Sequence, residues 1–334
     1  MLRQAIDRTI AWLFTKRDFQ SVRDFLSRIL RPLWPTYEFG KLPSSMVGYG
    51  RRGVAKVDGH CAWCLRKIDA ALDINPGSGE AFFRARRVTN VLSGVTGSQN
   101  GGPVDLLCHV FPIRVRREPA MVLYCGAAPD LPAFVGELLP RFLALDQFDV
   151  PNDLLLLVNL RMGRQRFFQD ALNDQIFRPR PIEIMRQFHL VGLHTLYVLS
   201  EPALHPAHLQ RAAERFKMIY GPYDPLERPL FLCSGGARRA AMLARKYSTC
   251  VPDVFGKDYM LIDPARAPLK DVVRAVAGAS HIAAPNTGEA AVLALARAQK
   301  RDFYEISAAR AAHRLADRLL DVIGETRHRI RRIV

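Results

Sequence analysis

The feature that most constrains the fold is an alternation of short apolar runs with segments of helical periodicity, which becomes regular from Val104 onward. Apolar runs of strand length lie at residues 121–124, 154–158, 196–199, 230–233, 260–262, 281–284 and 303–306. Helical patterns lie between or beside them, at 131–144, 165–176, 207–220, from Ala237, at 269–277 and at 289–298. Alternating strands and helices are typical of parallel sheets with crossover helices. The sequence therefore predicts the α/β class.

A break rich in glycine and proline at residues 221–225 divides this alternation into two sets. A chain of 334 residues with 49% hydrophobic residues can bury a large core, and domain sizes favour two domains over one. We therefore expect two Rossmann-like domains facing a cleft, at 46–221 and 222–334, after an N-terminal amphipathic helical segment at 1–45. A last helix capped by Ser307 is expected to cross back to the first domain.

Two other segments lie outside this alternation. Residues 35–102 contain many glycines, prolines and polar turns, with weak periodicity. The basic residues 327–332 are interpreted as a solvated C-terminal tail.

The N-terminal segment favours two alternatives. Apolar residues recur at helical spacing between Ile6 and Trp34, with arginines between them. This pattern suits a helix on an anionic membrane surface, and equally a helix packed on its own domain. No run reaches the roughly 18 apolar residues of a membrane span, and Lys16 and Arg17 interrupt any signal peptide. With only six cysteines, mostly in apolar runs, we expect a cytoplasmic protein, either free or peripheral at the inner face of the membrane.

The charge favours anionic partners. Lys and Arg number 48 against 32 Asp and Glu, a formal net charge of +16. Nucleic acid, anionic lipid and phosphorylated substrates fit this balance, and a solvated basic surface is the plain alternative. Few aromatic residues (9%) and no recognisable recognition module argue against nucleic acid. Cys61 and Cys64 after His60 suggest zinc, but no second cysteine pair follows at finger spacing, so we expect no metal.

Two junctions between an apolar run and a helix carry residues suited to phosphate. The first has Ser234, Gly235 and Gly236, followed by Arg238 and Arg239, and the second has Asn286, Thr287, Gly288 and Glu289. The first N–H groups of a helix lack partners and carry about half a positive charge, so they attract anions. Two such junctions predict a site for a nucleoside diphosphate. An ordinary N-cap at 286–288 and a solvated helix face for the two arginines are the alternatives.

The order of motifs between Asp130 and Ile306 resembles glycosyltransferase family 61. The family's Asn-Tyr-Tyr-His-Trp-Leu-x-Asp/Glu-x-Leu-Pro-Arg stretch is similar to residues 130–141, which keep its end and have Ala133 at the position of a family histidine. Its strand followed by Arg-x-x-x-x-Arg-Arg is similar to 231–239, where Ser234 replaces the first arginine. Its Gly-x-x-Gly-Ala-Gly-Leu turn is similar to 284–292, which retain Gly288. A strand with Glu305 follows, as in the family.

This resemblance implies a GT-B-like fold, with an acceptor-side domain followed by a domain that binds the nucleotide sugar. It implies transfer of a sugar to a hydroxyl of a polysaccharide or lipid-linked acceptor, with no cofactor beyond the nucleotide-sugar co-substrate. Because no Asp-x-Asp motif is present, Arg238 and Arg239 are expected to replace a metal. We also expect a transfer that inverts the anomeric centre. The departures at Ala133 and Ser234 allow two interpretations: a divergent enzyme with another donor, or an inactive relative that binds a nucleotide or glycan as a partner protein.

Glu137 is the candidate catalytic base, since inverting transfer requires a group that takes the proton of the acceptor hydroxyl. It lies in the segment that resembles the family, within an otherwise apolar helical pattern. An ion pair with Arg141, four residues later, is the alternative role.

Overall fold

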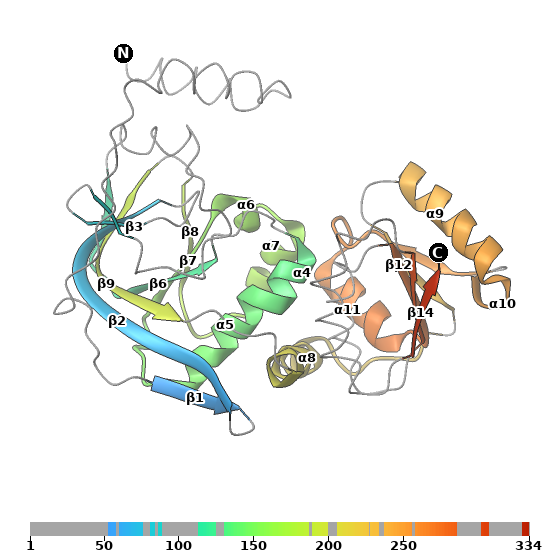
Figure 1. The fold of residues 1–334 in the computed structure, drawn as a ribbon, viewed down its shortest axis with the longest axis horizontal. Coiled ribbons are helices and arrows are strands. Elements are labelled where there is room, and N and C mark those ends of the chain that lie inside the picture. The colour runs from blue at the N-terminus through green and yellow to red at the C-terminus, as the bar shows by residue number, and fades with distance from the viewer. Residues whose placement is uncertain are drawn as a thin grey trace, which may run out of the picture.

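The structure of the protein is a computed structural model. It describes residues 53–57, 60–75, 81–83, 86–88, 113–124, 130–186, 189–199, 206–226, 228–233, 237–255, 258–285, 302–306 and 329–333. These residues form two sheets with helices packed against them, so the predicted α/β class is confirmed (Figure 1).

The first sheet is mixed and has nine strands in the described chain. They are β1 (Gly53–Val57), β2 (His60–Ile74), β3 (Ala81–Phe83), β4 (Arg86–Val88), β5 (Arg114–Arg116), β6 (Ala120–Tyr124), β7 (Leu155–Val158), β8 (Ile182–Ile184) and β9 (Val191–Leu199). The order is β4-β3-β2-β9-β6-β7-β8, with β1 beside β2 and β5 beside β9. The strands β9, β6, β7 and β8 are mutually parallel, whereas β2 runs antiparallel to β9.

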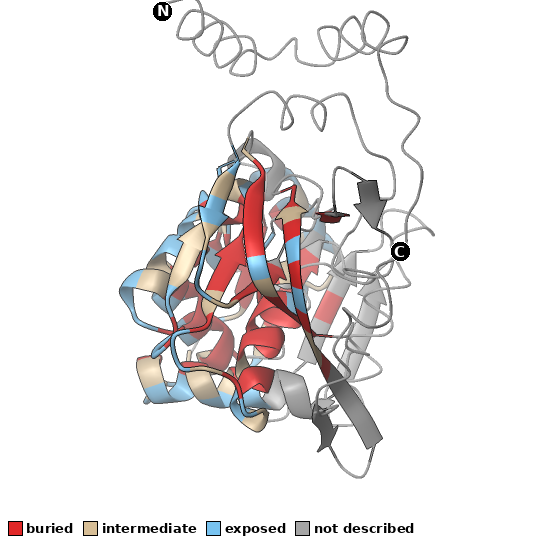
Figure 2. Cartoon of the chain, turned by 90° about the vertical axis from the view of Figure 1, so that its left-hand side faces the viewer, coloured by how far each residue is buried: buried red, intermediate tan, exposed pale blue. Residues whose placement is uncertain are grey.

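Helices cover one face of this sheet. They are α4 (Leu131–Ala133), η2 (Phe134–Leu138), α5 (Leu139–Ala144), η3 (Leu145–Gln147), α6 (Leu160–Gly163), α7 (Arg166–Asn173) and α8 (Pro206–Tyr220). Met121 and Leu123 of β6 share a core with the helices, while Ala120 and Val122 belong to a second buried cluster. Burial on both faces explains why the parallel strands are continuously apolar in sequence. Figure 2 shows the buried residues along these strands and on the helices behind them.

The second sheet is entirely parallel. Its strands are β10 (Leu230–Leu232), β11 (Met260–Ile262), β12 (His281–Pro285), β13 (Asp302–Ile306) and β14 (Arg329–Ile333), in the order β11-β10-β12-β13-β14. The helices α9 (Ala237–Cys250), α10 (Pro252–Phe255) and α11 (Leu269–Gly278) accompany them. Alternate residues of β10 belong to different cores: Leu230 and Leu232 share one with α11, and Phe231 shares another with Ala244 of α9. The two helices therefore lie on opposite faces of the sheet.

The two halves of the chain share one continuous core. Val272 and Val276 of α11 belong to the same buried cluster as Phe216 of α8 and Phe168 of α7. In Figure 1, α11 faces the helices of the first sheet, whereas α9 and α10 lie on the far side. Burial of apolar surface is the main force that holds the halves together.

The expected strands and helices within the described residues are confirmed, with ends that differ by a few residues. Two segments are more regular than their sequence patterns indicated. Residues 35–102 contain β1 to β4, and β2 alone has 15 residues. The supposed basic tail contains β14, which pairs in parallel with β13. The segment 1–45 and the helices expected at 289–298 and after Ser307 lie outside the described residues. In the part of the chain that the structure describes, no helix has the length and apolarity needed to cross a membrane.

Candidate functional site

The strand order of the second sheet reverses at β10. From β10 the chain moves to β11 on one side, and it then returns to β12 on the other side of β10. Leu230 is in register with Ile282 and Phe231 with Ala283. In open parallel sheets, ligands bind outside the carboxyl ends of the strands at such a reversal, because the connections leave toward opposite faces and open a crevice. The region outside the carboxyl ends of β10 and β12 is therefore the candidate site.

Both predicted phosphate junctions begin at this edge. Residues 234–236 follow β10 after Cys233, and residues 286–289 follow Pro285, the last residue of β12. Because β10 and β12 are parallel neighbours, the two runs leave the same edge of the sheet, side by side. Ser234, Gly235, Gly236, Asn286, Thr287, Gly288 and Glu289 themselves lie outside the described residues.

The helix α9 begins at the same edge, one junction after β10. Arg238 and Arg239 lie in its first turn, where backbone N–H groups have no intrahelical acceptor. The structure describes the backbone of Arg238 and Arg239 but not their side chains. A helix of 14 residues that starts at the carboxyl end of a strand directs its positive end toward the candidate site.

Glu137 lies on the helix that follows β6 in the first half. Asp130 caps this helix, since its Oδ1 accepts a hydrogen bond from the N–H of Ala133 at 2.8 Å. The middle turn, η2, is a π-helix in which the N–H of Leu139 donates to the carbonyl of Phe134. Pro140 explains the wide turn, because it has no N–H to donate and its ring needs space near the preceding turn.

The side chain of Glu137 is exposed, whereas its neighbours Phe134, Val135, Gly136 and Leu138 are buried. Arg141, the proposed ion-pair partner, is 4% exposed. Single π turns are frequent at functional sites, because they displace one side chain from the regular helical positions. The strand order of the first sheet reverses at β6, the strand before this helix. From β6 the chain continues to β7 and β8 on one side, whereas β9 lies on the other side of β6.

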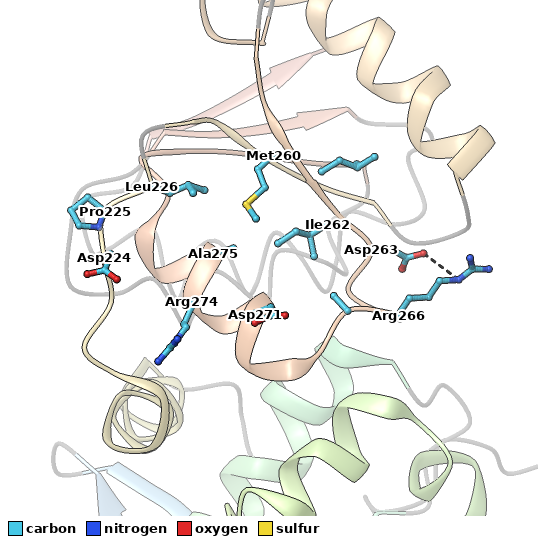
Figure 3. A pocket seen from close by; sticks show the side chains of 12 residues that line it. Asp224, Pro225, Leu226, Met260, Ile262, Asp263, Arg266, Asp271, Arg274 and Ala275 are labelled. Carbon is cyan, nitrogen blue, oxygen red and sulfur yellow. Dashed lines mark ion pairs between the residues drawn. The ribbon is translucent and has the colours of Figure 1, made fainter.

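A pocket of about 620 Å³ lies beside β11, the edge strand next to β10. Three segments line it: residues 224–226, β11 with the turn that follows it, and the middle of α11 between Asp271 and Ala275. Figure 3 shows Leu226, Met260, Ile262 and Ala275 around its interior, with charged residues at its margin. We call it the β11 pocket. It was not predicted from the sequence.

Asp263 lines the β11 pocket at the carboxyl end of β11. It follows the last residue of β11, and the N–H of Cys233 donates to the carbonyl of Ile262 at 3.0 Å. Asp263 Oδ1 accepts from the N–H of Ala265 at 3.0 Å, and Oδ2 lies 3.7 Å from Nε of Arg266 (Figure 3). The side chain of Asp263 is 23% exposed and that of Arg266 78%. An acidic residue directly after the apolar run 260–262 was the signal that could have identified this position.

Polar contacts from the first half fix the turn after β11 and the helix α11. Oδ2 of Asp170, in α7, accepts from the N–H of Leu269 at 2.9 Å, so it caps α11. Arg166 of α7 donates to the carbonyl of Arg266 at 2.7 Å. Nε of Arg274 donates to the carbonyl of Tyr220 at 3.1 Å. The wall of the β11 pocket is therefore held by the other half of the molecule.

Two tyrosines near the contact between the two halves of the molecule have raised pKa values. Burial, together with a 2.6 Å hydrogen bond from its hydroxyl to Oδ2 of Asp174, raises the pKa of Tyr220. Burial raises the pKa of Tyr223 to about 12. The hydroxyl of Tyr223 has no hydrogen-bond partner among the described residues. Both phenols are therefore neutral at physiological pH.

No group of three or more His, Cys, Asp or Glu residues within the described ranges is arranged to hold a metal ion. No protein-family model matches the chain, and no curated protein is significantly similar to it in sequence. The resemblance to glycosyltransferase family 61 therefore depends on the motifs themselves.

Proposed function

We propose that the protein is a glycosyltransferase that moves a sugar from a nucleotide-sugar donor to a hydroxyl of a polysaccharide or lipid-linked acceptor. In this proposal the two halves are Rossmann-like domains of the GT-B kind, and the transfer inverts the anomeric centre without a metal. The observation that carries the proposal is the parallel pairing of β10 with β12, because it brings the starts of both predicted phosphate junctions to one edge of the sheet.

The chemistry requires fixed hydrogen-bond donors around the leaving diphosphate, since negative charge accumulates on its oxygens as the anomeric bond breaks. Backbone N–H groups at 234–236 and 287–289 would supply them, and the glycines permit a close approach. Arg238 and Arg239, at the start of α9, would each add charge-assisted hydrogen bonds of about 1.5–3 kcal/mol. Two fixed positive charges can neutralise a diphosphate, which is the role of the metal in other transferases. In this scheme, Glu289 accepts hydrogen bonds from the ribose hydroxyls.

The acceptor would bind on the side of the first half, where Glu137 removes the proton of the attacking hydroxyl. Three observations support this role. Glu137 is exposed, it lies on a π turn, and its helix follows the strand at which the order of the first sheet reverses. A basic protein suits an anionic acceptor or a cytoplasmic membrane surface, which agrees with the net charge of +16.

A ligand screen followed by a transfer assay tests the proposal. The wild-type protein is first screened by thermal shift against nucleoside diphosphates and nucleotide sugars, because tight ligands stabilise the folded state by mass action. Bound donors are then tested for transfer to glycan and lipid-linked acceptors. Transfer supports the proposal. Nucleotide binding without turnover of any donor favours the inactive partner protein. The absence of nucleotide binding refutes the glycosyltransferase and leaves only a partner protein that binds a glycan.

The arginine pair offers a sharper test. Arg239→Ala should weaken binding of the identified nucleoside diphosphate by about ten-fold or more, the loss expected for one charge-assisted hydrogen bond. Arg245→Ala is the matched control, because Arg245 is an exposed residue of the same helix, further from its start. If calorimetry gives equal affinities for the two variants and the wild type, Arg239 does not belong to the site.

A further inference from the structure

The β11 pocket extends along β11, the strand next to β10. Neighbouring strands lie about 4.8 Å apart, and β11 is hydrogen-bonded to β10 along its length. The 3.0 Å hydrogen bond from Cys233 to Ile262 continues this pairing to the last residues before the two turns. The turn at 263–267 therefore begins about one strand spacing from Cys233, the last described residue before the predicted junction at 234–236. In a nucleoside diphosphate, the ribose is the group next to the phosphates.

The pocket has the composition of a small-molecule site. Leu226, Met260, Ile262 and Ala275 supply apolar surface, and charged groups lie at the margin (Figure 3). Its volume of about 620 Å³ is typical of ligand pockets. Met260 is 39% exposed although it is a large apolar residue. A flat base that covers Met260 would remove this apolar surface from water.

Asp263 can recognise a ribose. One of its oxygens is used by the N–H of Ala265, while the other has Arg266 as its neighbour at 3.7 Å. An ionised carboxylate accepts about four hydrogen bonds, so it retains capacity for hydroxyl donors. In dinucleotide-binding sheets, an acidic residue about 20 residues after the phosphate turn accepts hydrogen bonds from ribose hydroxyls. Asp263 has the corresponding position in this sheet, since it follows the strand next to β10.

We propose that the β11 pocket binds the nucleoside part of the donor, with the base against Met260 and Ile262 and the ribose hydroxyls on Asp263. This inference rests on the proposed function, and it assigns to Asp263 the ribose contact otherwise expected from Glu289. The β11 pocket lies outside the sequence motifs on which the proposed function depends. The chemistry requires a ribonucleoside diphosphate, because a 2′,3′-dideoxy analogue offers no hydroxyls to the carboxylate.

Two variants of the full chain test it by calorimetry. Met260→Trp places a larger side chain in the part of the pocket assigned to the base. Met242→Trp, at a residue of α9 that is 64% exposed and does not line the pocket, is its control. We expect Met260→Trp to weaken binding of the best nucleoside diphosphate by about ten-fold or more and to leave inorganic pyrophosphate within about two-fold. Asp263→Asn keeps an acceptor for Ala265 and removes the charge, with Asp258→Asn as its control. It should weaken the ribonucleotide by about ten-fold and leave the dideoxy analogue unchanged.

Each alternative outcome identifies which idea fails. Unchanged nucleotide affinity in both variants overturns the pocket assignment and leaves the proposed function standing. Equal losses for the nucleotide and for pyrophosphate also overturn it, because the variants then act on the diphosphate site. A wild-type dimer that Met260→Trp converts to a monomer, with nucleotide affinity unchanged, assigns the pocket to a second copy of the chain. A wild-type protein that binds neither probe refutes the pocket and the proposed function together.

Discussion

Asp170 links the two halves of the molecule, so its removal should weaken their attachment. Its carboxylate lies on α7 of the first half and accepts from the N–H of Leu269 at the start of α11, at 2.9 Å. The side chain is 25% exposed, so solvent replaces this contact only in part. Asp170→Ala leaves the first N–H of α11 without a carboxylate, and water must reach it instead.

The expected loss follows from the geometry of this cap. Loss of a helix cap costs about 0.5–2 kcal/mol, and loss of a hydrogen bond to a charged group costs about 1.5–3 kcal/mol. We expect Asp170→Ala to lower the free energy of unfolding by about 2 kcal/mol. Asp170→Asn retains an acceptor oxygen and loses the attraction between a negative charge and the helix dipole, so it should cost about 0.3–1 kcal/mol.

Urea unfolding measured by far-UV circular dichroism and by tryptophan fluorescence tests this prediction. Asn173→Ala, at an exposed residue of the same helix, is the control and should change the free energy by less than about 0.5 kcal/mol. If Asp170→Ala separates the two signals into distinct transitions, the halves unfold independently once the contact is lost. An Asp170→Ala midpoint equal to that of the wild type, or an Asn variant as unstable as the Ala variant, would refute the reasoning.

Three further substitutions have defined outcomes. Glu137→Gln should lower transfer by about 10²–10⁴-fold and leave donor affinity unchanged, because only the proton acceptor is lost; retained turnover would exclude Glu137 as the base. Gly278→Ala should lower the unfolding free energy by about 1–3 kcal/mol, since its Cβ would lie 2.4 Å from the carbonyl oxygen of Asp224. A neutral result in urea would show that residues 224–226 can move. Tyr223→Phe should be neutral or stabilising at pH 7, because the buried hydroxyl has no partner among the described residues. The pKa of Tyr223, raised to about 12 in the folded state, also predicts that its contribution to the free energy of unfolding is constant below pH 10 and declines between about pH 10 and 12. The decline in the free energy of unfolding over this range should be smaller in the Phe variant. Identical pH profiles would contradict this assignment.

Local periodicity determined the elements that the sequence identified correctly. The helix 131–144 and the strands at 121–124 and 281–284 bury the residues that their patterns select, whereas the strand 260–262 buries only Ile262. The strand β2 was missed although Ile68, Ala70, Leu72 and Ile74 are buried at a period of two. Alanine and charged residues weaken the alternation of large apolar with polar residues in this segment. The strand is stabilised by antiparallel pairing with β9.

The strand β14 shows the same dependence on partners. Its sequence, with arginines at 329, 331 and 332, predicts a solvated tail. Its backbone register with β13 places Asp302 opposite Arg329 and Glu305 opposite Arg332. This pairing cannot be read from either segment alone.

For the candidate site, the sequence by itself determined the chemistry of the residues: two polar junctions, an arginine pair at a helix start, and a carboxylate in an apolar helix. Only the tertiary structure decided that β10 and β12 are parallel neighbours, and only it formed the β11 pocket from three segments between Asp224 and Ala275. The physical reason is that periodicity is a property of a few consecutive residues. Strand order depends instead on contacts between distant residues, which become favourable only when the whole core is buried.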